Sequence, residues 1–349
     1  GIQDHWKIIP NEIKNYRLPT IELPKTYIFI LPKTYNFKLP LTGRDEFFKE
    51  RAAEAGFDIE FVQLGGPDLT NRLLAEGQST TADIVFGLNE FSFQEIADEE
   101  LLESHAPAWK DEIAEDVPTR DDDLYAPVDY ARVFAIYNED EVDESELPTH
   151  WNDFYNDPQY ENRYFVPNAL GGATNSAVMY INLIEHRDDS QEMGVTQEGL
   201  DNVAQYFENG VTMPEGGPET WMPDFVSGEV PYSFTFMGNV TNFEQEYDVN
   251  IGVLDLDPGV IQTTEQIGII NDGEDNTVEQ EFIDWFGSEE VMAAFAEEHG
   301  QVPVNANASD SVDERLNEIM ENTTPVDLDY DWVGDHLDEW IEYVELNIL

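Results

Sequence analysis

A short apolar run followed by polar residues decides the fold: Ala82-Asp83-Ile84-Val85-Phe86-Gly87-Leu88-Asn89-Glu90. Its length, its β-branched residues and the glycine near its end are typical of a strand buried in a sheet. Upstream, apolar residues fall on one face of a helix over Arg44–Ala55, which stops at Gly56, and residues 58–62 alternate like a strand. Downstream, residues 126–130 lead into another predicted strand over 132–137.

The same alternation of helix and strand continues to the end of the chain. We expect helices over 68–75, 177–184, 200–209, 278–286, 288–299 and 332–346, and strands over 164–167, 230–236, 250–254 and 266–270. Such alternation predicts an α/β fold with mostly parallel sheets. With 349 residues the chain is long enough for about two domains, so we expect two α/β lobes.

The composition limits the classes of function. The chain has 16 Lys and Arg against 75 Asp and Glu, which gives a formal net charge of −59. A field this negative repels phosphate backbones and anionic lipid, so we expect no nucleic-acid partner and no binding to a membrane surface. Contents of 41% apolar and 12% aromatic residues exclude a disordered acidic tail. Because the sequence has no cysteine, we expect no disulfide, thiolate catalysis, zinc–thiolate site or lipid-anchored cysteine within it.

The acidic residues are dispersed along the chain rather than gathered in one block. After residue 51 the only lysine is Lys110. At about 1 M salt the Debye length falls to roughly 3 Å, so most of the repulsion among dispersed carboxylates disappears. This pattern predicts a protein adapted to molar salt; the alternative is an acidic protein of an ordinary environment.

The first 40 residues differ in charge from the rest. They carry a net charge of +3, whereas the remainder carries −62. Two octets that both begin Leu-Pro-Lys-Thr-Tyr, residues 23–30 and 31–38, repeat each other, and their prolines limit the segment to short extended pieces. The segment is either a basic arm for a partner or a stretch that is poorly ordered or foreign to the ancestral fold, which we favour. It has no signal-peptide pattern as written, and no later window is apolar enough to span a membrane.

Familiar catalytic motifs do not occur in the chain. The nucleophile elbow G-x-S-x-G, the P-loop and H-E-x-x-H are missing, and the six histidines are not at ligand spacing. Pairs of acids carry little information among 75 of them. We therefore predict neither a cofactor nor a metal. Sequons at Asn239, Asn307 and Asn322 permit glycosylation if the chain is exported.

The candidate binding residues are polar and aromatic side chains at the ends of predicted strands, where α/β folds bind ligands. They are Asn89, Glu90, Asp129, Tyr130, Thr174, Asn175, Ser176, Trp221, Ser233, Phe234, Thr235, Phe236 and Glu265. Aromatic rings with a few acids suit a flat, positively charged ligand. Two alternatives stay open: residues 174–176 form a plain helix N-cap, or Phe234 and Phe236, which share one face of a strand, both belong to the core.

From about residue 41 to the end, the order of segments resembles the periplasmic-type solute-binding proteins of ABC importers. The resemblance is closest to the thiamine-binding branch of the group that also takes iron(III) and polyamines. It rests on Thr81–Asn89, Ala126–Tyr130, Thr220-Trp221, 228–235, 282–290, 301–305 and the closing helix with Trp340. The resemblance implies the two-lobed periplasmic-binding-protein fold of type II, with residues 41–125 and 257–305 in lobe 1, 126–256 in lobe 2 and 306–349 as a C-terminal helical segment.

The resemblance also implies roles for the candidate residues. Trp221 would stack on the ligand, and Asn89 or Glu90 would meet it from the other lobe. Asp129 and Tyr130 would lie at the first crossover between lobes. The pair of tyrosines used for iron(III) is missing at 233–236, and the cysteine nucleophile of the thiamine-degrading enzymes on this scaffold is missing altogether.

We therefore expect an exported, cell-surface receptor of a salt-loving archaeon, a monomer and not an enzyme. It would close its lobes on thiamine or thiamine phosphate and deliver this ligand to a membrane permease. Within this class, the alternatives are a receptor for iron(III) or one for a polyamine, which would use Glu90, Asp129 and Glu265. Outside it, the alternatives are an acidic enzyme on the same scaffold or a non-functional paralogue that has lost its first strand.

Overall fold

One eight-stranded sheet runs through both halves of the molecule, in the strand order β2-β1-β3-β10-β5-β8. The computed structural model describes residues 27–32, 44–64 and 66–349. Strand β4 lies beside β10, β9 lies beside β5, and β6 and β7 form a separate small sheet. The strands are β1 Tyr27–Pro32, β2 Ile59–Leu64, β3 Ile84–Leu88, β4 Leu102–Glu103, β5 Ala126–Asn138, β6 Phe165–Val166, β7 Val211–Thr212, β8 Tyr232–Phe236, β9 Ile251–Leu254 and β10 Ile261–Ile270.

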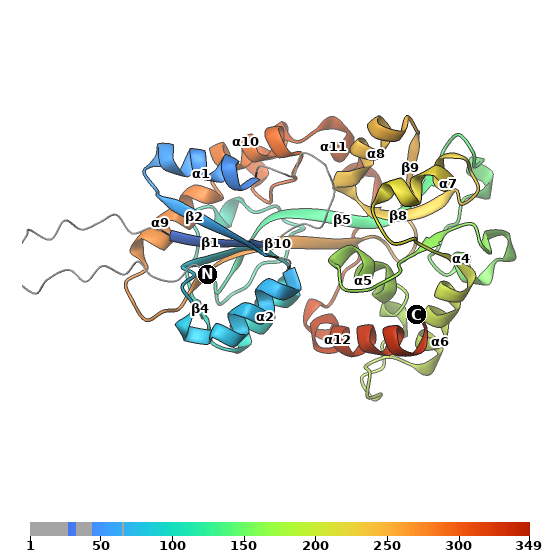
Figure 1. The fold of residues 1–349 in the computed structure, drawn as a ribbon, viewed down its shortest axis with the longest axis horizontal. Coiled ribbons are helices and arrows are strands. Elements are labelled where there is room, and N and C mark those ends of the chain that lie inside the picture. Colours follow the sequence, from blue (N-terminus) through green and yellow to red (C-terminus); the bar gives the residue numbers. More distant parts are fainter. Residues whose placement is uncertain (1–26, 33–43, 65) are drawn as a thin grey trace, which may run out of the picture.

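Helices cover both faces of this sheet (Figure 1). They are α1 Arg44–Ala55, α2 Gly66–Glu76, α3 Glu90–Asp98, α4 Asp153–Asn156, α5 Ala173–Tyr180, α6 Gln197–Asn209, α7 Met222–Val226, α8 Val240–Tyr247, α9 Thr277–Phe286, α10 Glu289–His299, α11 Glu314–Asn322 and α12 Tyr330–Asn347. The first half of the molecule holds β1 to β4 with α1 to α3, α9 and α10, and the second half holds α4 to α8 with β6 to β9. Helix α12 contacts α3 of the first half and α5 of the second.

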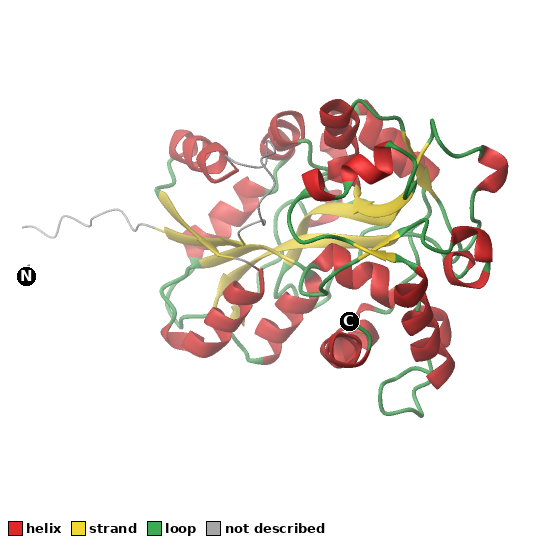
Figure 2. Cartoon of the chain, turned by 45° about the vertical axis from the view of Figure 1, so that its right-hand side comes forward, coloured by secondary structure: helices red, strands yellow, loops and turns green. Residues whose placement is uncertain are grey.

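Two long strands, β5 and β10, connect the halves, and we call them the connecting strands. Figure 2 shows the strands as one curved layer between helices. The halves, each with helices around its part of the sheet, form a two-lobed α/β fold, as the sequence predicts. The expectation of mostly parallel sheets is wrong, because β10 pairs antiparallel with β3, β4 and β5, and β5 pairs antiparallel with β8 and β9. The reason is that the connecting strands run between the halves in opposite directions.

Strand β1 lies within the segment that the sequence suggests to be foreign or poorly ordered. It pairs in parallel with β2 along its whole length and with β3 on its other side. Residues 27–32 are therefore not poorly ordered, and the sheet does not lack a strand at this position. Pro32 takes the last position of the strand, where a missing N–H costs least. The rest of the first 40 residues lies outside the described part of the chain.

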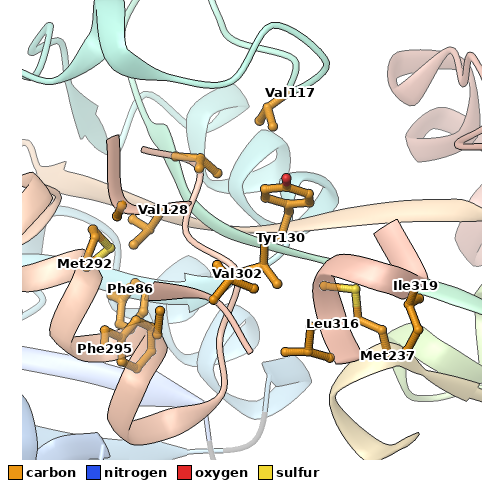
Figure 3. Close-up of a cluster of buried hydrophobic side chains, with 14 of the residues drawn as sticks. Phe86, Val117, Val128, Tyr130, Met237, Met292, Phe295, Val302, Leu316 and Ile319 are labelled. Carbon is orange, nitrogen blue, oxygen red and sulfur yellow. The ribbon is translucent and has the colours of Figure 1, made fainter. Parts of the chain in front are cut away.

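An apolar layer covers one face of the connecting strands and reaches into both halves. Figure 3 shows ten of its members: Phe86, Met292, Phe295, Val117, Val128, Tyr130, Val302, Met237, Leu316 and Ile319. Because these side chains belong to one buried cluster, the two halves share part of their core on this side of the sheet. Among the described helices, none is both long and apolar enough to cross a membrane.

A buried arginine fastens α11 to the connecting strands. Arg132 of β5 is 3% exposed, and its Nε donates to Gln262 Oε1 of β10 at 3.0 Å. Its Nη1 donates to the carbonyls of Met320 and Thr323, at 2.7 and 2.9 Å, where α11 ends. These carbonyls lie at a helix C-terminus, which carries partial negative charge, so the guanidinium satisfies both the hydrogen bonds and the charge.

Replacing Arg132 by methionine should destabilise the protein by about 3 kcal/mol, because buried carbonyls and an amide lose their donor. Urea unfolding in molar KCl measures the change. Arg187→Met is the matched control, because Arg187 is 40% exposed on its side chain, pairs with the surface acids Asp189 and Asp329 and lies over the Trp332 ring, which methionine can still contact, so its loss should cost less than about 1 kcal/mol. Equal effects of the two substitutions would contradict the anchoring role.

Candidate functional site

The first residue of α3 places a carboxyl group where the halves meet. Asn89, directly after β3, caps the helix by accepting from the Ser92 N–H at 3.0 Å. Glu90 follows, and its Oε2 accepts from the N–H and the hydroxyl of Thr264 on β10, at 3.2 and 3.1 Å. The Oε1 atom is inaccessible to solvent and has no hydrogen-bond partner among the described residues. One carboxylate oxygen of Glu90 is therefore uncommitted.

Aromatic side chains from three parts of the chain surround this position. Phe91 lies with its ring centre 6.3 Å from that of Tyr180 in α5 and 6.1 Å from that of Tyr330 at the start of α12. The Tyr330 hydroxyl donates to the Gln262 carbonyl at 2.6 Å. The Tyr180 hydroxyl is buried and, like Glu90 Oε1, has no partner among the described residues. We call Glu90, Phe91, Tyr180, Thr264 and Tyr330 the Glu90 cluster.

Burial sets the protonation of the Glu90 cluster. It raises the pKa of Glu90 from 4.5 to about 7, because hydrogen bonds from Thr264 only partly offset the loss of water. Burial also raises the pKa of Tyr180 and Tyr330, and the nearby Glu90 charge adds to both shifts. Both tyrosines therefore remain neutral donors.

A second group of charges lies on the connecting strands. Asp129 of β5 stands directly opposite Glu265 of β10 in the antiparallel register. Arg44, the first residue of α1, bridges them: its Nη2 lies 2.6 Å from Glu265 Oε2 and 3.6 Å from Asp129 Oδ2. Its guanidinium carbon lies 5.3 and 5.0 Å from the ring centres of Phe86 and Phe295. We call these five residues the Arg44 cluster.

Burial and then repulsion from Glu265 raise the pKa of Asp129 well above its ordinary value, although Arg44 opposes the shift. Asp129 therefore holds its proton to a higher pH than an exposed aspartate does, and Arg44 is the cation that pairs with both acids. Thr264 and Glu265 are consecutive on β10, and side chains alternate along a strand. The Glu90 and Arg44 clusters consequently approach β10 from opposite faces.

The other predicted residues lie elsewhere. Residues 174–176 do not precede a helix, because α5 begins at Ala173 with Gly172 as its N-cap, and they form its first turn. Tyr130 packs in the apolar layer over the connecting strands. Trp221 is 6% exposed and packs edge-on against Phe165, Phe225 and Phe243.

On β8, Ser233, Phe234 and Thr235 are buried, and Phe236 on the same face as Phe234 is half-buried. The Ser233 hydroxyl is a further buried group without a partner among the described residues, and Thr235 accepts from Asn239 at 3.1 Å.

The structure thus brings Asn89 and Glu90 together on one face of β10, and Asp129 and Glu265 on the other. Sequence reasoning missed Arg44, Tyr180, Thr264 and Tyr330. The available signal was weak: Arg44 is one of only 16 basic residues in an acidic chain. Among the described residues, no group of three or more His, Cys, Asp and Glu side chains is placed to hold a metal ion.

The sequence of the chain matches a known protein family. Residues 46–321 match the model of a family described as bacterial extracellular solute-binding protein. The chain belongs to this family. A curated relative, a probable ABC transporter periplasmic-binding protein of Sinorhizobium fredii, is 28% identical over 310 residues, which cover 87% of this chain and 83% of the relative. The chain is thus a solute-binding protein of ABC transport, a family of transport proteins that act outside the cytoplasmic membrane.

Solved structures share the fold at low sequence identity. A ferric binding protein from Campylobacter jejuni has a TM-score of 0.72 at 14% identity, covering 92% of this chain and all of that one. A periplasmic thiamin binding protein has a TM-score of 0.69 at 16% identity, covering 94% of this chain and 98% of the other. These similarities establish the two-lobed periplasmic-binding-protein fold.

The raised pKa of Glu90 predicts a pH-dependent penalty on the folded state. Between pH values near 4.5 and about 7, the unfolded chain loses the Glu90 proton while the folded protein keeps it, so this group's contribution to stability is lost as the pH rises. Glu90→Gln should therefore stabilise the solute-free protein at about pH 8 by up to ~3 kcal/mol relative to wild type, and much less at about pH 5. Urea unfolding at both pH values checks this, and a pH-independent difference would contradict it.

Proposed function

We propose that this solute-binding protein captures a small, flat organic cation, with thiamine or thiamine phosphate as the leading candidates, and hands it to a membrane permease. The observation that carries the proposal is the uncommitted Oε1 of Glu90 beside Tyr180 and Tyr330. A carboxylate among aromatic rings recognises a planar cation through charge, hydrogen bonding and cation–π contact, and rejects a neutral solute that leaves it unpaired.

The origins of these side chains support capture by closure of the lobes. Glu90 belongs to the first half, Tyr180 to the second, and Tyr330 to a helix that contacts both. A solute that binds all three favours the closed arrangement by its differential affinity for it. We assign lobe 1 to β1 and to residues 41–125 and 257–305, lobe 2 to 126–256, and a C-terminal helical segment to 306–349.

The charges favour one cationic group over several. A polyamine needs acids at both ends of its site, but Asp129 and Glu265 already share Arg44 as their partner. Iron(III) has less support, because the tyrosine pair expected at 233–236 is missing and the described residues offer no cluster of acids and histidines. For thiamine phosphate, the free N–H groups in the first turn of α5, at 173–175, are suited to the phosphate.

The net charge of −59 fits an exported monomeric receptor of a salt-loving archaeon, which works where salt screens its carboxylates. Calorimetry in molar KCl against thiamine, thiamine phosphate, spermidine and iron(III) tests the proposal. We expect binding of thiamine or its phosphate alone. If the folded protein responds to none of the four, the proposed ligand class is wrong.

Glu90→Gln should weaken binding of the cationic solute at least about tenfold, or ~1.4 kcal/mol, because the partner of its positive charge is lost. Glu99→Gln is the matched control, since Glu99 is exposed at the other end of α3. Calorimetry on both variants at about pH 8 measures the difference. Unchanged affinity in Glu90→Gln would remove the carboxylate from the site.

Trp221 packs in a different buried cluster from Phe91 and Tyr180, so its stacking on a solute is a separate part of the proposal, independent of the Glu90 cluster. Trp221→Phe keeps a ring against Phe165, Phe225 and Phe243 but removes the larger indole face. If the indole stacks on the solute, this change should lower affinity about three- to tenfold, a loss of ~1 kcal/mol. A variant with full affinity and a lowered melting temperature would assign Trp221 to the core alone.

A further inference from the structure

We infer that the Arg44 cluster is a cation site that the protein fills with its own side chain, and that the site accepts a free alkylguanidinium ion when that side chain is removed. The inference concerns the face of β10 opposite Glu90, and it does not depend on which solute the protein carries.

The two acids of the cluster require a cation. Asp129 and Glu265 face each other directly across antiparallel strands, an arrangement in which like charges repel. Asp129 is 3% exposed, so water screens this repulsion poorly. Without a positive charge between them, the connecting strands would carry an uncompensated pair of acids at the place where they pair.

The site has the chemistry that recognises a guanidinium group. Arg44 Nη1 and Nη2 donate to the two oxygens of Glu265, at 3.3 and 2.6 Å, in the bidentate arrangement that matches a planar fork to a carboxylate. The rings of Phe86 and Phe295 lie within cation–π distance of the guanidinium carbon. An ammonium ion lacks both the fork and the planar face, so it fits this site less well.

The tether to α1 leaves the site incompletely satisfied. Among the residues that the structure describes, buried Arg44 Nε has no acceptor and buried Asp129 Oδ2 has no hydrogen-bond donor. The nearest guanidinium nitrogen stays 3.6 Å from that oxygen. A free guanidinium that is not held by the helix is able to shift toward Asp129. It can therefore form a hydrogen bond with Asp129 that Arg44 does not form.

The position of Arg44 also gives it a structural effect. It begins α1 of the first half, while its acidic partners lie on both connecting strands. The side chain therefore ties a helix of one half to the strands that run between the halves. Because Arg44 already pairs with the two acids, they are not available to a solute cation.

Chemical rescue tests the inference. Arg44→Ala removes the atoms that correspond to ethylguanidinium, so we expect the variant to melt at a lower temperature and to regain stability with added ethylguanidinium. The rise should saturate at one ion per chain, with a dissociation constant in the millimolar range, at constant ionic strength in KCl. Ethylammonium should bind at least about tenfold more weakly, a difference of ~1.4 kcal/mol.

Two variants serve as controls. Arg51→Ala removes an arginine of the same helix that pairs with Glu298 at 2.5 Å and lies 4.7 Å from the Phe47 ring, but on the exposed surface. It should show no saturable rescue. The double variant Arg44→Ala/Glu265→Gln should lose the rescue, because the bidentate acceptor is gone.

Equal responses of Arg44→Ala and Arg51→Ala, equal effects of the two cations, or no response in folded Arg44→Ala would each overturn the inference. If Arg44→Ala does not fold, it is refolded from urea with either cation. Recovery of the native circular-dichroism spectrum with ethylguanidinium alone supports the site, and recovery with neither or with both contradicts it.

Discussion

The pairing of β5 with β10 is the constraint on which the molecule depends, because these strands belong to both halves and carry both charged clusters. Their register places Asp129 opposite Glu265, and the same register places Arg132 opposite Gln262. A shift by one residue would move every side chain to the other face of the sheet. It would separate the acids from Arg44 and Thr264 from Glu90, so the geometry of the candidate site is a consequence of this one pairing.

A chain with so many acids places two of its few arginines at this pairing. Arg44 and Arg132 are 13% and 4% exposed on their side chains, and both bond groups far away in the sequence. Molar salt screens ion pairs on the surface but has much less effect on buried ones. The described surface pairs, such as Arg187 with Asp189, therefore contribute little to stability in molar salt, whereas the two buried guanidinium groups keep their stabilising effect. If the protein works in molar salt, as we propose, these two buried groups are the ion pairs that still stabilise the connecting strands there.

Sequence reasoning reached the fold through local patterns and missed what depends on distant residues. The helix over Arg44–Ala55 has the predicted bounds, and Glu90 was found because it directly follows a recognisable strand. The antiparallel direction of β10 leaves no local signal, since alternation of helix and strand says nothing about which way a long strand returns. The Asp129–Glu265 pair was equally hidden, because 136 residues separate two acids that look like the other 73.

What can bind around β10 depends on which of the acids there already has a positively charged partner, and not on how many acids there are. Glu90 and Glu265 lie on opposite faces of the same strand and are both placed near aromatic rings. Glu265 is paired with an arginine, whereas Glu90 has two neutral donors for one oxygen and, among the described residues, none for the other. Under the proposed function, the solute supplies the positive charge that this carboxylate lacks, and burial raises the free energy of the site until it does. A single buried carboxylate would then favour a singly charged, flat cation over a polyamine, because the neighbouring acids Asp129 and Glu265 are already paired with Arg44.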